Sequence, residues 1–256
     1  MKYKVMAGLK KTSIFWALLL LVIIMSILSP SFLTGRNLAN VVKQISINGI
    51  LAVGMTVVII TGGIDLSVGS IVSLSSIVAA MFAVANSGYP LFVPVILALS
   101  TGVLVGLFNG AGVAYAKFPP FIITLSSMTI VRGISLLVTN GIPIFGLSDG
   151  LINLANGTSL GIPNLIYYLI AVFAAGSFLL NFTVFGRHLY AVGGNEISAN
   201  SSGIHVNFVK LAAYSISGFC AGLAGLLAAS RITSGNPTTG EGYEMNAIAA
   251  AVIGGV

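Results

Sequence analysis

The fold is decided by the stretch Thr61-Gly62-Gly63-Ile64-Asp65-Leu66-Ser67-Val68-Gly69-Ser70, which interrupts apolar runs over residues 41–60 and 68–85. Asp65 is one of two aspartates in 256 residues. An ionised carboxylate at the centre of a membrane helix costs about 2.5–3.5 kcal/mol, so it faces protein or water rather than lipid. Gly62 and Gly63 allow the backbone to leave helical geometry, and Ser67 can cap the helix that restarts. The stretch therefore predicts a broken helix, over residues 62–67, that lines a cavity.

The composition is that of a polytopic membrane protein. Hydrophobic residues make up 57% of the chain and charged residues 6%, and the mean hydropathy is +1.06, which excludes an ordinary water-soluble domain. The net charge of +6 indicates cytoplasmic loops and anionic lipid head groups as partners, rather than nucleic acid. The single cysteine, Cys220, lies in an apolar run without an intrachain disulfide partner, so we expect it to serve packing.

The apolar runs predict an all-α, polytopic transmembrane helical bundle with seven full spans and an eighth that begins near Glu244. The seven spans are expected over residues 12–28, 41–60, 68–86, 91–116, 121–139, 165–181 and 209–230. About a dozen residues of the eighth precede Val256, fewer than the roughly 20 that a crossing needs, so a truncated eighth span is expected. Residues 1–256 are predicted to form one transmembrane domain.

The distribution of basic residues predicts the orientation. Lys2, Lys4, Lys10 and Lys11 precede the first span, which places the N-terminus in the cytoplasm by the positive-inside rule. Residues 140–163 and 231–243 then fall outside, and residues 183–207 form a polar loop inside.

Two features within the spans have alternative readings. Gly102, Gly106 and Gly110 recur every four residues, a ridge that allows close approach of another helix but is also compatible with a glycine-rich helix without a special partner. Arg132 can contact a polar substrate, or it can extend its long stem to the outer interface.

The inner loop carries the signals of a short exposed helix. Gly193 and Gly194 can turn the chain, Asn195 can cap a helix, and Glu196 in its first turn suits the helix dipole. Gly203 can end the segment, which leaves a helix of about two turns.

Several motifs together resemble the permease subunits of ribose-type bacterial ATP-binding-cassette (ABC) sugar importers. The first is the stretch quoted above. The others follow in order along almost the whole chain: Ala52-Val53-Gly54-Met55-Thr56, Gly186-Arg187, Tyr190-Ala191, Gly193-Gly194-Asn195-Glu196, Ser202-Gly203-Ile204, Gly242-Tyr243-Glu244 and Ala247-Ile248-Ala249-Ala250.

The resemblance implies a channel-forming subunit of the bacterial inner membrane for a monosaccharide such as ribose. Its implied partners are a second permease copy, a cytoplasmic ATP-binding subunit and a periplasmic sugar-binding protein. Such permeases commonly have about ten spans with both termini inside, so by resemblance the last two and part of the eighth are expected to be missing.

The resemblance also assigns residues 183–207 to ATPase coupling. The implied coupling residues are Gly186, Arg187, Tyr190, Gly193, Gly194, Asn195, Glu196, Ser198, Ser202, Gly203 and Ile204. Relatives often carry two alanines after the glutamate and a basic residue further on, whereas Ile197-Ser198 and Asn200 stand here. A weaker helix and a less positively charged contact are expected.

The translocation pathway needs small polar groups, because sugars are uncharged and rich in hydroxyls. Asn48, Thr56, Ser67, Ser70, Ser73 and Asn109 are the candidates for lining it, although such residues in membrane helices also serve to bond helices together. Gly62, Gly63 and Asp65 are expected to form a gate, with the Asp65 carboxylate accepting hydrogen bonds at the restarted helix.

The absence of sequence motifs argues against nucleotide binding, metal binding and hydrolase activity in this chain. The chain has no Gly-x-x-x-x-Gly-Lys-Ser/Thr loop for nucleotide phosphates, so ATP hydrolysis is expected on another subunit. It also lacks a metal-ligand cluster and a serine-hydrolase motif, so neither a cofactor nor an enzymatic activity is expected. An ion-coupled secondary transporter of a small polar solute is the alternative, although such carriers usually need more intramembrane carboxylates or histidines than Asp65 alone.

Overall fold

Apolar helices form most of the chain in the computed structural model, which describes residues 13–85 and 87–256. The four N-terminal lysines on which the orientation was predicted, and the end of the third predicted span at Asn86, lie outside the described residues. The chain divides into two units, one up to Gln44 and one over Ile45–Val256.

Five helices in the described part are long and apolar enough to cross a membrane. They are α3 (Gly35–Ile60), α5 (Phe92–Ala114), α6 (Pro120–Thr139), α8 (Asn164–Phe182) and α11 (Val206–Ile232). Three shorter apolar helices are α2 (Ser13–Leu28), α4 (Val68–Phe82) and α12 (Tyr243–Ile253). The all-α polytopic architecture is thus observed, while the number of seven full spans is not confirmed.

The remaining elements lie in the connections between apolar helices. They are α7 (Asp149–Asn156), the antiparallel hairpin of β1 (Thr158–Ser159) and β2 (Ile162–Pro163), α9 (Val184–Gly194) and α10 (Glu196–Ser201). The sequence indicated only a loop over residues 140–163. Helix α7 forms there because Leu151 and Ala155 bury one face, and Asp149 in its first turn suits the helix dipole.

In the N-terminal unit, α2 is followed by a tight turn into α3. The Thr34 hydroxyl accepts from the Asn37 backbone N–H, and the Thr34 carbonyl accepts from Leu38 at 2.9 Å. Thr34 therefore caps α3, which begins at Gly35 rather than near residue 41, where the second span was expected.

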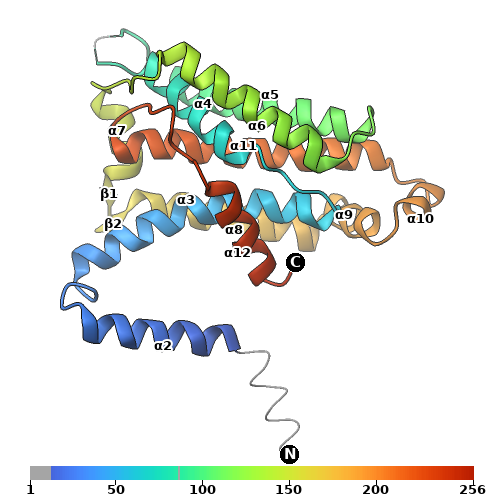
Figure 1. Ribbon diagram of the computed structural model, residues 1–256, viewed down its shortest axis with the longest axis horizontal. Helices are drawn as coiled ribbons and strands as arrows, with labels where there is room; N and C mark the ends of the chain where they lie inside the picture. Colours follow the sequence, from blue (N-terminus) through green and yellow to red (C-terminus); the bar gives the residue numbers. More distant parts are fainter. Residues whose placement is uncertain (1–12, 86) are drawn as a thin grey trace, which may run out of the picture. The chain divides into compact units, whose positions relative to one another are not determined.

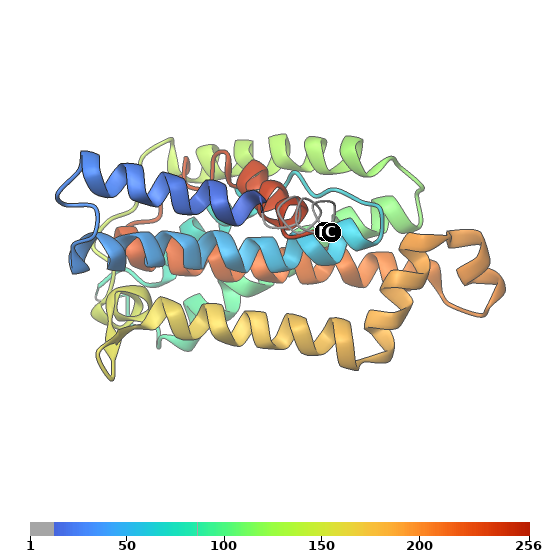
Figure 2. The same cartoon turned by 90° about the horizontal axis from the view of Figure 1, so that it is seen from below.

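Helix α11 lies at the centre of the second unit and packs against α4, α5 and α7 (Figures 1 and 2). The glycine ridge of α5 makes the close approach possible. A Cβ at Gly102 would overlap the Gly218 carbonyl oxygen, and one at Gly110 would lie 2.9 Å from the Leu211 carbonyl oxygen. The ridge therefore has a defined partner, which decides between the two alternatives left open for it.

Candidate functional site

The break between α3 and α4 is a segment that runs back into the bundle. Helix α3 ends at Ile60, where the Thr61 hydroxyl donates to the Val58 carbonyl oxygen at 2.7 Å and Gly62 takes the left-handed conformation (φ 77°). The chain then runs without helical structure from the α9 end of the bundle to its middle, where α4 begins (Figure 1). Because α4 starts within the bundle, 15 residues suffice to reach the opposite end.

Four side chains form a buried polar group at this break, which we call the Asp65 cluster: Asp65, Ser67, Asn109 and Ser217. All four are at most 2% exposed. Asp65 Oδ1 accepts from the Ser67 backbone N–H at 3.0 Å and from the Ser67 hydroxyl at 2.6 Å. Asp65 Oδ2 accepts from the Ser217 hydroxyl at 2.8 Å, and Asn109 Nδ2 donates to Ser67 Oγ at 2.8 Å.

The Asp65 cluster joins three elements that are far apart in the sequence. Asp65 lies in the break, Asn109 on α5 and Ser217 on α11, so their hydrogen bonds hold the start of α4 to both helices. A buried carboxylate of this kind is retained only when hydrogen bonds replace its water. The cluster therefore fixes where α4 begins.

The expected cap of α4 is formed differently from the sequence prediction. Ser67 stands at the N-cap position, but its side chain makes no capping hydrogen bond. Its hydroxyl donates to Asp65 instead, and Asp65 provides the acceptor for the Ser67 N–H. The carboxylate lies at the positive end of the α4 dipole, where the sequence predicted it.

Two further residues at the break were not identified from the sequence. The Tyr214 hydroxyl and the Thr124 hydroxyl each lie 3.4 Å from the Ile64 carbonyl oxygen. Tyr214 is fully buried, and its hydroxyl is the atom nearest to a Cβ added at Gly63, at 2.5 Å. Gly63 is therefore needed for space rather than for a left-handed turn. The only sequence signal for Tyr214, as for Ser217, was a polar group within an apolar helix.

The six predicted pathway residues separate into two groups by exposure. Asn48 and Thr56 are partly exposed on α3. Ser67, Ser70, Ser73 and Asn109 are fully buried and make hydrogen bonds inside the bundle, apart from Asn109 Oδ1, which has none. Ser70 donates to the Ser67 carbonyl and Ser73 to the Pro237 carbonyl, at 2.8 Å and 2.6 Å.

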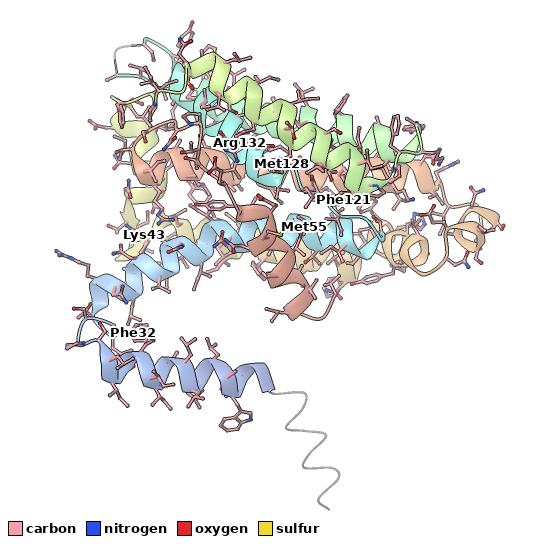
Figure 3. The ribbon with its side chains drawn as sticks, in the orientation of Figure 1. Phe32, Lys43, Met55, Phe121, Met128 and Arg132 are labelled. Carbon is pink, nitrogen blue, oxygen red and sulfur yellow. The ribbon has the colours of Figure 1, made fainter. Side chains whose placement is uncertain are left out.

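A second segment runs back into the bundle, between α11 and α12; we call residues 233–242 the return loop. It leads from the end of α11 to α12, which begins near the middle of the bundle (Figure 1). Arg132 points from α6 toward this loop (Figure 3), and its Nη1 donates to the carbonyls of Pro237 at 2.8 Å and Thr239 at 3.3 Å. Arg132 is therefore bound to protein rather than extended to the interface.

The two broken regions pack directly on each other. A Cβ at Gly69 would overlap both the Gly240 carbonyl oxygen and the carboxylate of Glu244, and a Cβ at Gly240 would overlap the Gly69 carbonyl oxygen. The first turn of α4 therefore contacts the return loop with a glycine on each side, and it also contacts the Glu244 carboxylate in the first turn of α12.

The predicted coupling segment, residues 183–207, contains two short helices. Thr183 caps α9 by accepting from the Gly186 N–H at 3.0 Å, and Asn195 caps α10 by accepting from the Ser198 N–H at 2.9 Å. Gly203 ends the segment in the left-handed conformation, with φ 83°. The Asn195 cap and the Gly203 stop agree with the sequence prediction.

Other parts of the coupling segment differ from the prediction. Gly193 and Gly194 do not turn the chain; they form the last turn of α9, and the turn comes at Asn195. Helix α10 has six residues, and Glu196 in its first turn pairs with Lys210 of α11. Figure 2 shows α10 projecting beyond the ends of the long helices.

The implied coupling residues differ in exposure. Gly186 is buried and Ile204 half-buried, whereas Arg187, Tyr190, Gly193, Gly194, Asn195, Glu196, Ser198, Ser202 and Gly203 are exposed. The segment thus exposes several polar side chains at its tip, together with the apolar side chain of Ile197, which is 81% exposed.

The base of the coupling segment contacts the break. A Cβ at Gly193 would overlap the carbonyl oxygen of Ile60, the last residue of α3. A cavity of about 470 Å³ lies at this contact, lined among others by Gly62, Gly63 and Tyr214 on one side and by Asn195 and Glu196 on the other. Two of the three residues predicted to form a gate, Gly62 and Gly63, thus meet residues predicted to couple to an ATPase at one end of the bundle.

The site offers no arrangement for metal binding in the described residues, where no three His, Cys, Asp or Glu side chains come together. Asp65 contacts serine hydroxyls and backbone N–H groups. Its environment is that of a structural carboxylate rather than of a nucleophile or a general base.

Known proteins match nearly the whole chain. A family model described as branched-chain amino acid transport system / permease component matches residues 37–256. The ribose import permease of Haemophilus influenzae is 43% identical over 245 residues, which cover 94% of this chain and 75% of that protein. The ribose import permease of Bacillus subtilis is 46% identical over 249 residues, 96% of this chain and 77% of that protein. No solved structure matches the chain.

Permeases named for other sugars are also similar to this chain. The D-allose transport system permease of Escherichia coli is 38% identical over 250 residues, which cover 96% of this chain and 75% of that protein. All these relatives are permeases, so the chain is a transport component rather than an enzyme, and a multi-pass protein of the bacterial inner membrane. The chain belongs to the permease-component family of ABC importers that includes the ribose import permeases.

Proposed function

We propose that this chain forms the pathway for a monosaccharide such as ribose, and that it works with a cytoplasmic ATP-binding subunit, a periplasmic sugar-binding protein and a second copy of itself. The relatives at 41–46% identity are ribose import permeases. The second copy follows from the family resemblance. We also propose that the N-terminus and α10 lie on the cytoplasmic side.

The coupling role of α9 and α10 rests on one observation, the backbone contact between Gly193 and Ile60. A force applied to the exposed tip of α10 reaches the end of α3 through this contact. From there it reaches the break, which is pinned to α5 and α11 by the Asp65 cluster. Movement of the coupling segment would thus shift the end of α3 and the Gly62-Gly63 turn, while the start of α4 stays pinned to α5 and α11.

In this proposal the Asp65 cluster belongs to the gate as its fixed point. Gly62 and Gly63 supply the flexible part, since Gly62 lies in the left-handed region and is exposed. Asn48 and Thr56 on α3 are the candidates to contact the passing sugar, and the buried Ser67, Ser70, Ser73 and Asn109 support the helices around it.

Uptake into proteoliposomes tests the function. The chain is reconstituted with its ATP-binding subunit and its binding protein, and uptake of labelled D-ribose is measured with and without ATP. ATP-dependent uptake that needs all components is expected. Uptake driven by an ion gradient with this chain alone would favour the secondary transporter instead.

Crosslinking tests the coupling role and the orientation. A cysteine at Ser198 or Ser202, both exposed at the tip, is expected to crosslink to the ATP-binding subunit in membranes. A cysteine at Leu160, which is 97% exposed in the hairpin, is the matched control and should not crosslink to it. Crosslinks from Ser198→Cys or Ser202→Cys to the periplasmic binding protein would overturn both the coupling role and the orientation.

A further inference from the structure

A cavity of about 310 Å³ lies beside the return loop, at the end of α11 far from α10. Its polar lining comes from Arg231, Asn236, Thr238, Thr239, Glu241 and Tyr243, and Ile47 and Ala228 supply part of the apolar wall. The cavity is thus open to both kinds of contact that a sugar ring makes, polar along its edge and apolar across its face.

The charged groups in this lining are available to a ligand. Lys210 and Glu196 form the one ion pair in the part of the chain that the structure describes, so Arg231 and Glu241 line the same cavity without an ion-pair partner there. Each sugar hydroxyl both donates and accepts a hydrogen bond. A lining that offers a guanidinium donor, a carboxylate acceptor and threonine hydroxyls can satisfy both functions of neighbouring hydroxyls.

The size of the cavity limits the ligand. Sites for small molecules span about 300–1,000 Å³, so this cavity lies at the small end of the range and suits one monosaccharide rather than a longer saccharide.

The return loop is held in place from the side of α6 and α4. Arg132 donates to the carbonyls of Pro237 and Thr239, and the Ser73 hydroxyl donates to the same Pro237 carbonyl at 2.6 Å. On the loop itself, Asn236 Oδ1 accepts from the Thr238 N–H at 3.0 Å. The loop therefore presents its side chains from a fixed backbone, as a binding site requires.

The position of the cavity also suggests a binding site. It lies where a broken segment leads into α12, beside the contact of that segment with the first turn of α4. In transporters, pairs of interrupted apolar segments mark substrate sites, because irregular backbone is tolerated only where it is buried or lines a cavity.

We infer that this cavity is a monosaccharide-binding site in which Arg231 and Glu241 bind the sugar hydroxyls, and that Arg132 is a positioning residue that holds the return loop. The inference rests on the proposed function and adds to it the place where the sugar first enters the permease. The end of the bundle opposite α10 is the end at which a periplasmic binding protein would release it.

Protection of a cysteine from a thiol reagent tests the site. Thr238→Cys places an exposed thiol at the cavity, while the native Cys220 is 4% exposed and does not compete. The permease and its ATP-binding subunit are assembled in nanodiscs without the binding protein, and labelling is followed with D-ribose or with betaine, which has no hydroxyl. D-ribose is expected to slow labelling by the factor 1 + [sugar]/Kd, about tenfold at about nine times Kd. Leu160→Cys, exposed at the same end of the bundle, should be labelled at an unchanged rate.

Three further single variants and one double variant distinguish a specific sugar site from a surface that sugar covers without specific contacts. Arg231→Gln and Glu241→Gln should abolish protection without changing the labelling rate in the absence of sugar. Arg132→Gln should raise that sugar-free rate, since it frees the loop. Protection that persists in the Arg231→Gln, Glu241→Gln double variant, or that is equal at Leu160→Cys, would overturn the inference.

The remaining outcomes are also decisive. If Thr238→Cys does not assemble, Ile232→Cys reports on the same cavity, which its 40% exposed side chain lines. Protection by the binding protein without any sugar would identify a protein-docking surface instead and overturn the sugar site. ATP-dependent uptake of D-ribose by the same complex is measured in parallel. Uptake without protection refutes this site alone, whereas absence of uptake refutes the proposed function.

Discussion

Removal of the Asp65 carboxylate should destabilise the bundle strongly, because three buried hydrogen bonds end on it. In Asp65→Ala, the Ser67 N–H, the Ser67 hydroxyl and the Ser217 hydroxyl all lose their acceptor. Each unpaired buried donor costs about 1–3 kcal/mol, and the serine hydroxyls can partly recover by rotating toward other acceptors. We therefore expect the free energy of unfolding to fall by about 3–6 kcal/mol.

Two milder variants calibrate this number. Asp65→Asn keeps the acceptor for Ser67 and can donate to Ser217, so a loss of about 1–2 kcal/mol is expected. Ser217→Ala removes one bond to a charged group and should cost about 1.5–3 kcal/mol. The matched control is Ser215→Ala on the same helix, whose hydroxyl bonds only to the Leu211 carbonyl, with an expected change within about 0.5 kcal/mol.

Equilibrium unfolding in mixed micelles, followed by circular dichroism, measures these differences. A double-mutant cycle between Asp65→Asn and Ser217→Ala should give a coupling energy of at least about 0.5 kcal/mol, because the two side chains are in contact. The reasoning is refuted if Asp65→Ala unfolds at the same detergent fraction as Ser215→Ala. It is also refuted if Asp65→Asn and Ser217→Ala are strictly additive.

Three further variants test contacts outside the Asp65 cluster. Gly193→Ala should reduce coupled transport at least about tenfold, since its Cβ would overlap the carbonyl of the last α3 residue. Gly194→Ala, with open space around it, should change transport by no more than about twofold. Equal effects of the two variants in uptake assays would show that this contact does not transmit the coupling. Asn195→Ala should destabilise α10 by about 1 kcal/mol and speed amide hydrogen exchange at Ser198 about fivefold. Asn195→Asp, which keeps the acceptor, should change neither quantity. Unchanged exchange in Asn195→Ala would mean that the cap is not needed. Arg132→Gln should lower the free energy of unfolding by about 1–3 kcal/mol, measured as above, and an unchanged value would show that the return loop is held without it.

The sequence was sufficient to predict a structural feature where the interactions that form it are local. Gly62 and Gly63 marked the break, the Asn195 cap bonds three residues ahead, and the Gly203 stop depends on its own backbone. Long apolar runs predicted the helices, because burial in lipid requires helical backbone hydrogen bonding whatever the tertiary contacts. The ends of helices were predicted less accurately. Helix α3 begins at Gly35 rather than near residue 41, since Thr34 supplies its cap.

Only the tertiary structure decided which polar groups meet. Ser217 lies 152 residues from Asp65, and Asn109 lies 42 residues from Ser67, so no spacing in the sequence indicates these contacts. The same holds for Arg132, because its acceptors, the carbonyls of Pro237 and Thr239, lie 105 and 107 residues away in the sequence. A polar residue in an apolar helix indicates that a hydrogen-bond partner is needed, because an unpaired polar group inside a membrane is costly. Which residue becomes that partner depends on how the helices pack.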